Sequence, residues 1–294
     1  MTGMLQVVRA GALTTVQDLG RPGHAHLGVP PSGALDEPAH RLANALTGNP
    51  AGAATLETTM NGCAVRVPAT VTAAVTGAPC PVRVDGRPVA WGTAVRVPAG
   101  AVLEVGTATH GLRSYLALGG GVAVEPVLGS RSTDLLSGLG PKPLADGDAL
   151  PLGTPSAAAP AVDWAPPRGP ALPVREVVLP VLLGPREDWF SRKGLQTLAA
   201  GEFTVSSRSN RIGLRTEGDR VERDREGELP SEGMALGAIQ VPPDGSPVLF
   251  LNDHPTTGGY PVVGVVPAVH LAAAAQAVPG TPVRFEVRGR RPAR

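Results

Sequence analysis

Residues 82–89, Val82-Arg83-Val84-Asp85-Gly86-Arg87-Pro88-Val89, predict a tight β-hairpin. Asp-Gly is favoured in a two-residue hairpin loop, because both central positions of that turn need a left-handed backbone. Before the turn, Val82 and Val84 alternate with Arg83, as expected for a strand with one buried face, and Val89 follows the turn. We therefore expect short strands and tight turns in the sequence around this hairpin.

Similar valine-rich runs continue on both sides of the hairpin. In the first half they are Val65-Arg66-Val67, Val71–Val75, Val95-Arg96-Val97 and Val102–Val105. In the second half, strand-like runs cover residues 177–183, 203–206, 248–251, 262–266 and 283–287. The 38 glycines and 32 prolines lie between such runs without a repeat period, so they indicate turns. This pattern predicts a mainly β protein built as barrels or sandwiches.

A few short helices are expected among the strands. The clearest one starts at Asp36, a good N-cap with Pro38 in the first turn, and stops at Gly48-Asn49-Pro50. Two others are expected over residues 191–199 and 269–277. The Ala/Pro-rich residues 154–173 lack apolar periodicity and predict a linker or exposed excursion. We therefore expect an N-terminal half over residues 1–153 and a C-terminal half over residues 174–290.

Composition and missing motifs exclude several functions. The net charge is +1 and no long basic run is present, so binding to nucleic acid through a basic face is not expected. No signal peptide and no run long enough to cross a bilayer are found, which predicts a soluble, cytoplasmic protein. The chain contains no Gly-Lys-Ser/Thr, no HExxH and no CxxC, so it is expected to bind neither ATP nor a metal by itself. Cys63 and Cys80 lie in strand-like runs and are expected to be buried, reduced thiols.

Two polar, glycine-rich clusters stand out in the first half. Residues 17–23 contain Arg21, which is suited to clamping a carboxylate or phosphate, and they lead on to Asp36 at the helix start. The alternative is a turn-rich connection in which Asp36 only caps the helix. Residues 129–134, Gly129-Ser130-Arg131-Ser132-Thr133-Asp134, combine hydroxyls with a guanidinium as an anion cradle does, or form plain side-chain turns.

Two more clusters lie in the second half. Residues 206–213 place Asn210 beside Arg211, which suits bidentate binding of a carboxylate or amide, or else marks an edge strand guarded by charge. Residues 253–261, from Asp253 to Pro261, lie between apolar strands and offer a potential base, two hydroxyls and a tyrosine. His254 fits a structural role as well as a catalytic one.

The order of these clusters resembles the biotin-dependent carboxyltransferase family that includes KipA and the C subunit of 5-oxoprolinase. The resemblance covers residues 5 to 288 and rests on Leu13–Gly23, Ser32–Asp36, Arg41–Asn44, Leu128–Asp134, Ser209–Arg215, Gly237–Gly245 and Thr256–Pro261. It implies two cyclophilin-like β-barrel subdomains, in agreement with the strand pattern. It also implies an enzyme that works only as a heteromeric complex.

In that complex the partners would be a KipI-like B subunit and a hydantoinase-like A subunit, and a partner subunit would use ATP. Together they would hydrolyse the lactam of 5-oxoproline to glutamate, and we expect this chain to be inactive alone. One alternative is a KipA-like regulatory protein that binds a KipI-like kinase inhibitor. Another is a subunit of the biotin-dependent urea carboxyltransferase type. A chain that carries biotin itself would need a lysine within a Met-Lys-Met-type turn. Neither Lys142 nor Lys193 has a methionine neighbour, so any biotin would be attached to another chain.

The clusters and the resemblance together predict the site. Three arginines are expected to bind a small carboxylate or amide substrate: Arg21, Arg131 and Arg211. The remaining substrate-binding residues are expected to be Ser132, Asn210, Gln240, Thr256, Thr257, Gly258 and Tyr260. Asp36 and Asp253 are the candidates for proton transfer.

Overall fold

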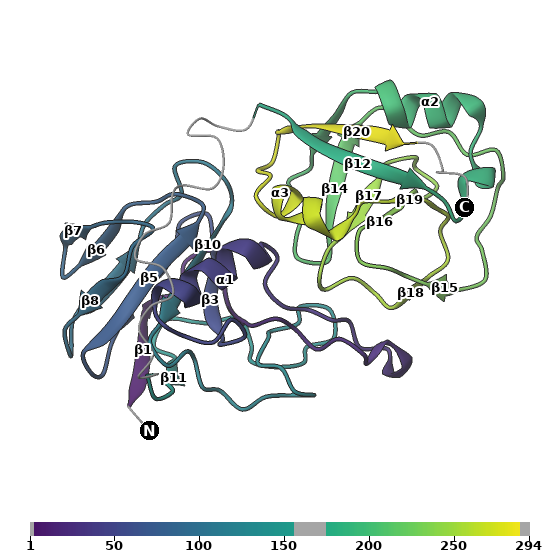
Figure 1. The fold of residues 1–294 in the computed structure, drawn as a ribbon. Helices are drawn as coiled ribbons and strands as arrows, with labels where there is room; N and C mark the ends of the chain where they lie inside the picture. Colours follow the sequence, from purple (N-terminus) through teal and green to yellow (C-terminus); the bar gives the residue numbers. More distant parts are fainter. Residues whose placement is uncertain (1–2, 156–174, 289–294) are drawn as a thin grey trace. The chain divides into compact units, whose positions relative to one another are not determined.

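The computed structural model of the chain describes residues 3–155 and 175–288, and its contacts divide them into two units (Figure 1). The first unit holds the described residues of Met1–Arg21, Ser32–Asp134 and Gly138–Pro173. The second holds those of Val174–Arg294, together with Pro22–Pro31 and Leu135–Ser137. Two short segments of the first half therefore pack with the second unit. Nearly all of the expected linker, residues 154–173, lies outside the described residues.

The first unit is made of two antiparallel sheets. One has the order β11-β1-β4-β9-β6-β7 and the other the order β2-β3-β10-β5-β8. The strands of the first sheet are β1 (Met4–Arg9), β4 (Ala64–Arg66), β6 (Val82–Val84), β7 (Arg87–Val89), β9 (Val102–Val105) and β11 (Ala149–Pro151). Those of the second are β2 (Thr14–Gln17), β3 (Thr55–Thr59), β5 (Val71–Gly77), β8 (Val95–Val97) and β10 (Arg113–Leu118).

The predicted hairpin is confirmed. Val84 pairs with Arg87, and the two residues between them, Asp85 and Gly86, have φ values of 47° and 76°. Both values are left-handed, as the Asp-Gly turn requires.

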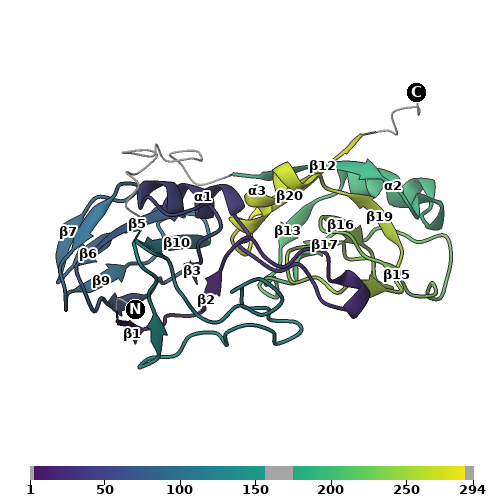
Figure 2. The same ribbon diagram turned by 60° about the horizontal axis from the view of Figure 1, so that its bottom comes forward.

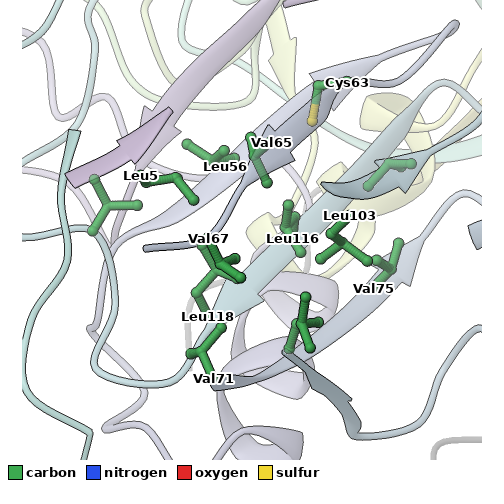
Figure 3. Close-up of a cluster of buried hydrophobic side chains, with 14 of the residues drawn as sticks. Leu5, Leu56, Cys63, Val65, Val67, Val71, Val75, Leu103, Leu116 and Leu118 are labelled. Atoms are coloured by element: carbon green, nitrogen blue, oxygen red, sulfur yellow. The ribbon is translucent and has the colours of Figure 1, made fainter. Parts of the chain in front are cut away.

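The core of the first unit lies between its two sheets (Figure 3). Leu5, Val65 and Leu103 come from the first sheet, and Leu56 and Leu116 come from the second. Each of these five side chains is at most 1% exposed. Burying a side chain of this size stabilises the fold by about 1.5–3 kcal/mol. Cys63 belongs to the same cluster as a buried free thiol, and burial raises its pKa to about 12.

Helix α1 (Glu37–Leu46) covers the other face of the second sheet, over β5 and β10 (Figures 1 and 2). It starts where predicted, because the Asp36 carboxylate accepts a hydrogen bond from the Ala39 amide at 3.1 Å. Ala39 and Ala43 pack against Tyr115 of β10. Small residues at these positions let the helix lie close to the sheet.

The second unit is a closed barrel with the order β12-β19-β16-β17-β14-β13-β20. Its strands are β12 (Val177–Leu183), β13 (Phe203–Val205), β14 (Gly213–Gly218), β16 (Ala238–Gln240), β17 (Val248–Phe250), β19 (Val262–Val265) and β20 (Pro282–Arg288). β12 and β20 are parallel, and the other neighbours are antiparallel. Phe203 and Phe285 meet edge to face at 5.3 Å.

Short elements complete the second unit. They are α2 (Arg192–Ala200) beside β20, α3 (Leu271–Ala275), the 3-10 turns η1 (Ala25–Leu27), η2 (Glu187–Trp189) and η3 (Ala268–His270), and a small sheet of β15 (Glu232–Gly233) and β18 (Thr257–Gly258) (Figure 1). The prediction of a mainly β fold with a few short helices is confirmed. Within the described ranges, no helix is long and apolar enough to cross a bilayer.

Candidate functional site

Asp18 joins the two polar clusters of the first unit. Its Oδ1 accepts hydrogen bonds from the Gly20 amide at 2.8 Å and from the hydroxyls of Ser130 and Ser132 at 2.5 and 2.6 Å. Its Oδ2 accepts from the Arg131 amide at 2.6 Å. The side chain is only 6% exposed. Asp18 was not among the predicted site residues, although four donors converge on its carboxylate.

Arg21 lies inside the same pair of loops. The residue is 1% exposed, and its guanidinium donates to the backbone carbonyls of Val127, at 3.3 Å, and Ser132. Ser132 is fully buried, and its hydroxyl also accepts from the Asp18 amide at 3.0 Å. Both side chains therefore hold the loops together in this structure. Their expected role in substrate binding stays a prediction.

Arg131 differs from the other predicted arginines because its guanidinium end is available. The side chain is half-buried, and its Nε donates to the Val124 carbonyl at 2.7 Å. Within the described ranges, Nη1 and Nη2 of Arg131 form no hydrogen bond and no ion pair. Two parallel donors on an anchored side chain match the geometry of a carboxylate.

Asp36 lies in a separate, buried network of the first unit. Its amide donates to the Tyr115 hydroxyl at 2.7 Å, and that hydroxyl donates to Oε2 of Glu57 at 2.8 Å. Glu57 Oε2 also accepts from the Leu35 amide at 3.0 Å. Burial, assisted by the Glu57 charge, raises the pKa of Tyr115 well above its usual value. Asp36 is 8% exposed as a residue, and its carboxylate caps α1. The residue also lines a cavity of about 40 Å³, which is water-sized.

Arg211 and Asp253 form a buried ion pair in the second unit. Nε and Nη2 of Arg211 donate to Oδ2 and Oδ1 of Asp253 at 2.9 and 3.0 Å. The two side chains are 1% and 0% exposed. The Leu135 amide also donates to Oδ2 of Asp253, at 3.1 Å, so Asp253 fastens the 135–137 segment to this unit. A carboxylate occupied in this way is poorly placed for proton transfer, and that role stays a prediction.

The loop at residues 256–260 is held by Gln240 and by the small sheet. Nε2 of Gln240 donates to the Tyr260 carbonyl at 2.9 Å. Gly258 fits closely, because a Cβ there would lie 2.9 Å from that Nε2. Thr257 is exposed and Thr256 half-buried. In the part of the chain that the structure describes, neither hydroxyl forms a hydrogen bond, so both are available to a ligand.

The remaining predicted residues of the second unit have local roles. Oδ1 of Asn210 accepts from the amides of Ile212 and Gly213 at 2.9 and 3.3 Å, which makes a side-chain turn on the surface. His254 is 4% exposed, stacks on Phe250 and bonds the Pro255 carbonyl through Nδ1 at 2.7 Å. Burial lowers the pKa of His254, as expected for a structural, neutral histidine.

The structure thus places the predicted residues in four groups, apart from Asn210, which forms its own turn on the surface. Arg21, Arg131 and Ser132 lie together around Asp18, and Arg211 lies against Asp253. Gln240, Gly258 and Tyr260 lie together with Thr256 and Thr257, and Asp36 stands in the Tyr115 network. No group of three or more metal-binding side chains is found in the described ranges. A hollow of about 660 Å³ on the second unit is lined by none of these residues.

Comparison with known proteins identifies the family. Residues 27–287 match the model of the carboxyltransferase domain, subdomain A and B. The chain belongs to this family. It is 39% identical to the C subunit of 5-oxoprolinase from Escherichia coli K12 over 289 residues, covering 96% of this chain and 90% of that protein. The predicted resemblance is therefore confirmed.

The chain also matches parts of larger proteins. The chain is 34% identical to urea amidolyase of Lachancea kluyveri over 304 residues and spans 95% of its own length but 17% of that protein. The crystal structure of TTHA0988 matches with a TM-score of 0.86 and 35% identity, covering 96% of this chain and 56% of that one. The K. lactis urea amidolyase structure matches with a TM-score of 0.85 and 30% identity, covering 96% and 18%.

Proposed function

We propose that this chain is the C subunit of an ATP-dependent 5-oxoprolinase, which opens the lactam of 5-oxoproline to glutamate. The observation that carries the proposal is the similarity to the E. coli protein across nearly the whole of both chains. Water adds to the lactam carbonyl, the carbon–nitrogen bond breaks and the nitrogen leaves as an amine. ATP hydrolysis on a partner subunit drives the reaction.

Arg131 is the group that we assign to the substrate carboxylate. Its amide is fixed by Asp18 and its Nε by Val124, while Nη1 and Nη2 remain available among the described residues. Loss of a hydrogen-bonding interaction with a charged group costs about 1.5–3 kcal/mol. Removal of the Arg131 side chain should therefore raise KM for the substrate by about 10- to 100-fold.

The 256–260 loop supplies neutral donors. The hydroxyls of Thr256 and Thr257 are suited to an amide or to the oxyanion that forms when its carbonyl is attacked. Gln240 supports this loop through the Tyr260 carbonyl rather than through a free side chain. Asp36 and Asp253 stay the candidates for proton transfer, and Asp36 is the one that lines a small cavity.

The chain is proposed to act with partners and without a cofactor of its own. A KipI-like B subunit and a hydantoinase-like A subunit would complete the enzyme, and the A subunit would use ATP. The lack of any nucleotide-binding motif in this sequence supports that division.

A second candidate is carboxyl transfer from biotin to urea. It is favoured by the match to urea amidolyase, both in sequence and in structure. Urea resembles a lactam in presenting N–H and C=O groups side by side, so the same hydroxyls suit both substrates. Urea has no carboxylate, however, and gives Arg131 no partner.

The two candidates are separated by assaying the chain in complex with its partner subunits. ATP consumption is measured with 5-oxoproline or with urea, in the presence and absence of avidin. The proposed function predicts consumption with 5-oxoproline, insensitive to avidin, and a KM that rises about 10- to 100-fold in Arg131→Ala. Arg96→Ala, which removes an exposed arginine from β8, is the matched control. Avidin-sensitive consumption with urea alone would overturn the proposal in favour of carboxyl transfer.

A further inference from the structure

We propose that Asp18 is a positioning residue, which acts through Arg131 by fixing the turn that carries it. This inference rests on the proposed function, since it assumes that Arg131 binds the substrate carboxylate. Asp18 itself is only 6% exposed, and all the contacts described for it are to other parts of the chain. Its effect on a substrate must therefore pass through the residues that it holds.

The turn needs such support because its backbone is strained. Val127 and Ser130 exchange two backbone hydrogen bonds of 2.8 and 3.2 Å, with Leu128 and Gly129 between them. Leu128 has φ 51° and Gly129 φ 81°, so both are left-handed. This conformation suits glycine but costs a leucine about 1–2 kcal/mol. Leu128 is also 41% exposed, so its side chain gains little from burial.

Asp18 restrains the turn by hydrogen bonds to three consecutive residues that follow Leu128 and Gly129. It bonds the Ser130 hydroxyl, the Arg131 amide and the Ser132 hydroxyl. The Ser132 amide in turn donates to the Ser130 hydroxyl at 3.0 Å, which closes the network on itself. The backbone on both sides of Arg131 is thereby held to a single carboxylate.

The chemistry of this contact requires a carboxylate rather than an amide. Both oxygens of Asp18 accept, Oδ1 from three donors and Oδ2 from the Arg131 amide. Asparagine has the same shape but replaces one oxygen with an NH2 group, which would face a donor. Asp18→Asn therefore disrupts the network while changing the volume very little.

Arg131 has two anchors, its amide on Asp18 and its Nε on the Val124 carbonyl. When the hydrogen bond between the Arg131 amide and Asp18 is lost, only the bond from Nε to the Val124 carbonyl still holds the residue. The Nη atoms then sample a wider range of positions. An interaction that binds substrate and transition state equally changes KM and leaves kcat nearly constant. Asp18→Asn should thus raise KM for 5-oxoproline about 10-fold, with kcat within about 2-fold of the unmodified protein.

A double-mutant cycle in the reconstituted complex tests whether Asp18 acts through Arg131. If it does, the variant carrying both Asp18→Asn and Arg131→Ala has the KM of Arg131→Ala alone. Independent losses that multiply would overturn the proposal. Ser130→Ala keeps the carboxylate but removes one donor to it and the acceptor of the Ser132 amide, so it should raise KM in the same direction by a smaller factor. Asp146→Asn is the control, because Asp146 is an exposed carboxylate that accepts a hydrogen bond from the Ala10 amide, at 2.7 Å, away from the turn.

Hydrogen exchange of this chain alone tests the positioning without any substrate. In Asp18→Asn, amides of residues 127–134 should exchange at least about 10-fold faster, while those of α1 keep their rates. Unchanged exchange over residues 127–134 would overturn the positioning role even if the complex is active. A complex that releases no glutamate, combined with faster exchange, would instead refute the proposed function and leave the positioning role standing.

Discussion

The buried pair of Arg211 and Asp253 gives the sharpest prediction for stability. Asp253→Ala removes the carboxylate that holds this guanidinium through two hydrogen bonds, and leaves a charge that is 1% exposed. It also removes the acceptor of the Leu135 amide. Breaking a buried ion pair on one side costs about 3–5 kcal/mol. That corresponds to a change of about two to four orders of magnitude in the unfolding equilibrium.

The assay is urea unfolding at pH 7, followed by far-UV circular dichroism and by tryptophan fluorescence. Two probes are needed because a chain of two units can unfold in more than one step. The matched control is Glu37→Ala, which breaks the exposed pair with Arg41 on α1 and should cost about 0.3–0.5 kcal/mol.

Removal of both charges together should be less damaging than removal of one. Replacing Arg211 with Met and Asp253 with Leu should cost less than Asp253→Ala alone, because no unpaired charge is left in the interior. If Asp253→Ala shifted the urea midpoint no further than Glu37→Ala, the pair would not be a stabilising element and its assignment would be wrong.

Two other predictions follow from burial and from backbone geometry. Burial lowers the pKa of both His40 and His254 below the unfolded value of 6.5, so the unfolded chain binds more protons as the solution is acidified. The contribution of the two histidines to the free energy of unfolding is complete above pH 6.5 and declines below it. The urea concentration at the unfolding midpoint should therefore decrease when the pH is lowered from about 7 to about 5.5, and a midpoint that stays level or rises contradicts this. Gly62 (φ 66°) and Gly86 (φ 76°) are both left-handed, but a Cβ at Gly62 would lie 2.1 Å from the Val105 carbonyl oxygen, whereas a Cβ at Gly86 meets nothing within 4 Å. Gly86→Ala should lower the free energy of unfolding by about 1–2 kcal/mol, and Gly62→Ala should lower it clearly more. Thermal unfolding of both variants measures the difference, and equal losses would show that the contact at Gly62 relaxes freely.

The elements that could be predicted are those with local signals. The Asp85-Gly86 turn and the Asp36 cap each depend on residues close to one another in the chain, so the sequence contains the whole interaction. The helices near residues 192 and 271 were predicted to within a few residues for the same reason. How the strands of the first half divide between two sheets depends on contacts between distant residues, and no local pattern encodes it.

The site was predicted as a set of loops but not as a set of side-chain directions. Asp18 meets Ser130 across 112 positions and Arg211 meets Asp253 across 42. A motif shows that an arginine is present, but burial decides whether its guanidinium faces a ligand or a carbonyl of the chain. Arg21 and Arg131 looked alike in sequence, yet Arg21 is 1% exposed and Arg131 keeps two nitrogens available among the described residues.

This chain is proposed to be an obligatory part of a lactam-opening complex. The most direct measurement is ATP-dependent release of glutamate from 5-oxoproline, with this chain and its A and B partners purified together and each of the three omitted in turn. Glutamate is expected only when all three are present. A well-formed complex that releases none, or full release without this chain, would contradict the proposal; the first result would favour a regulatory role like that of KipA.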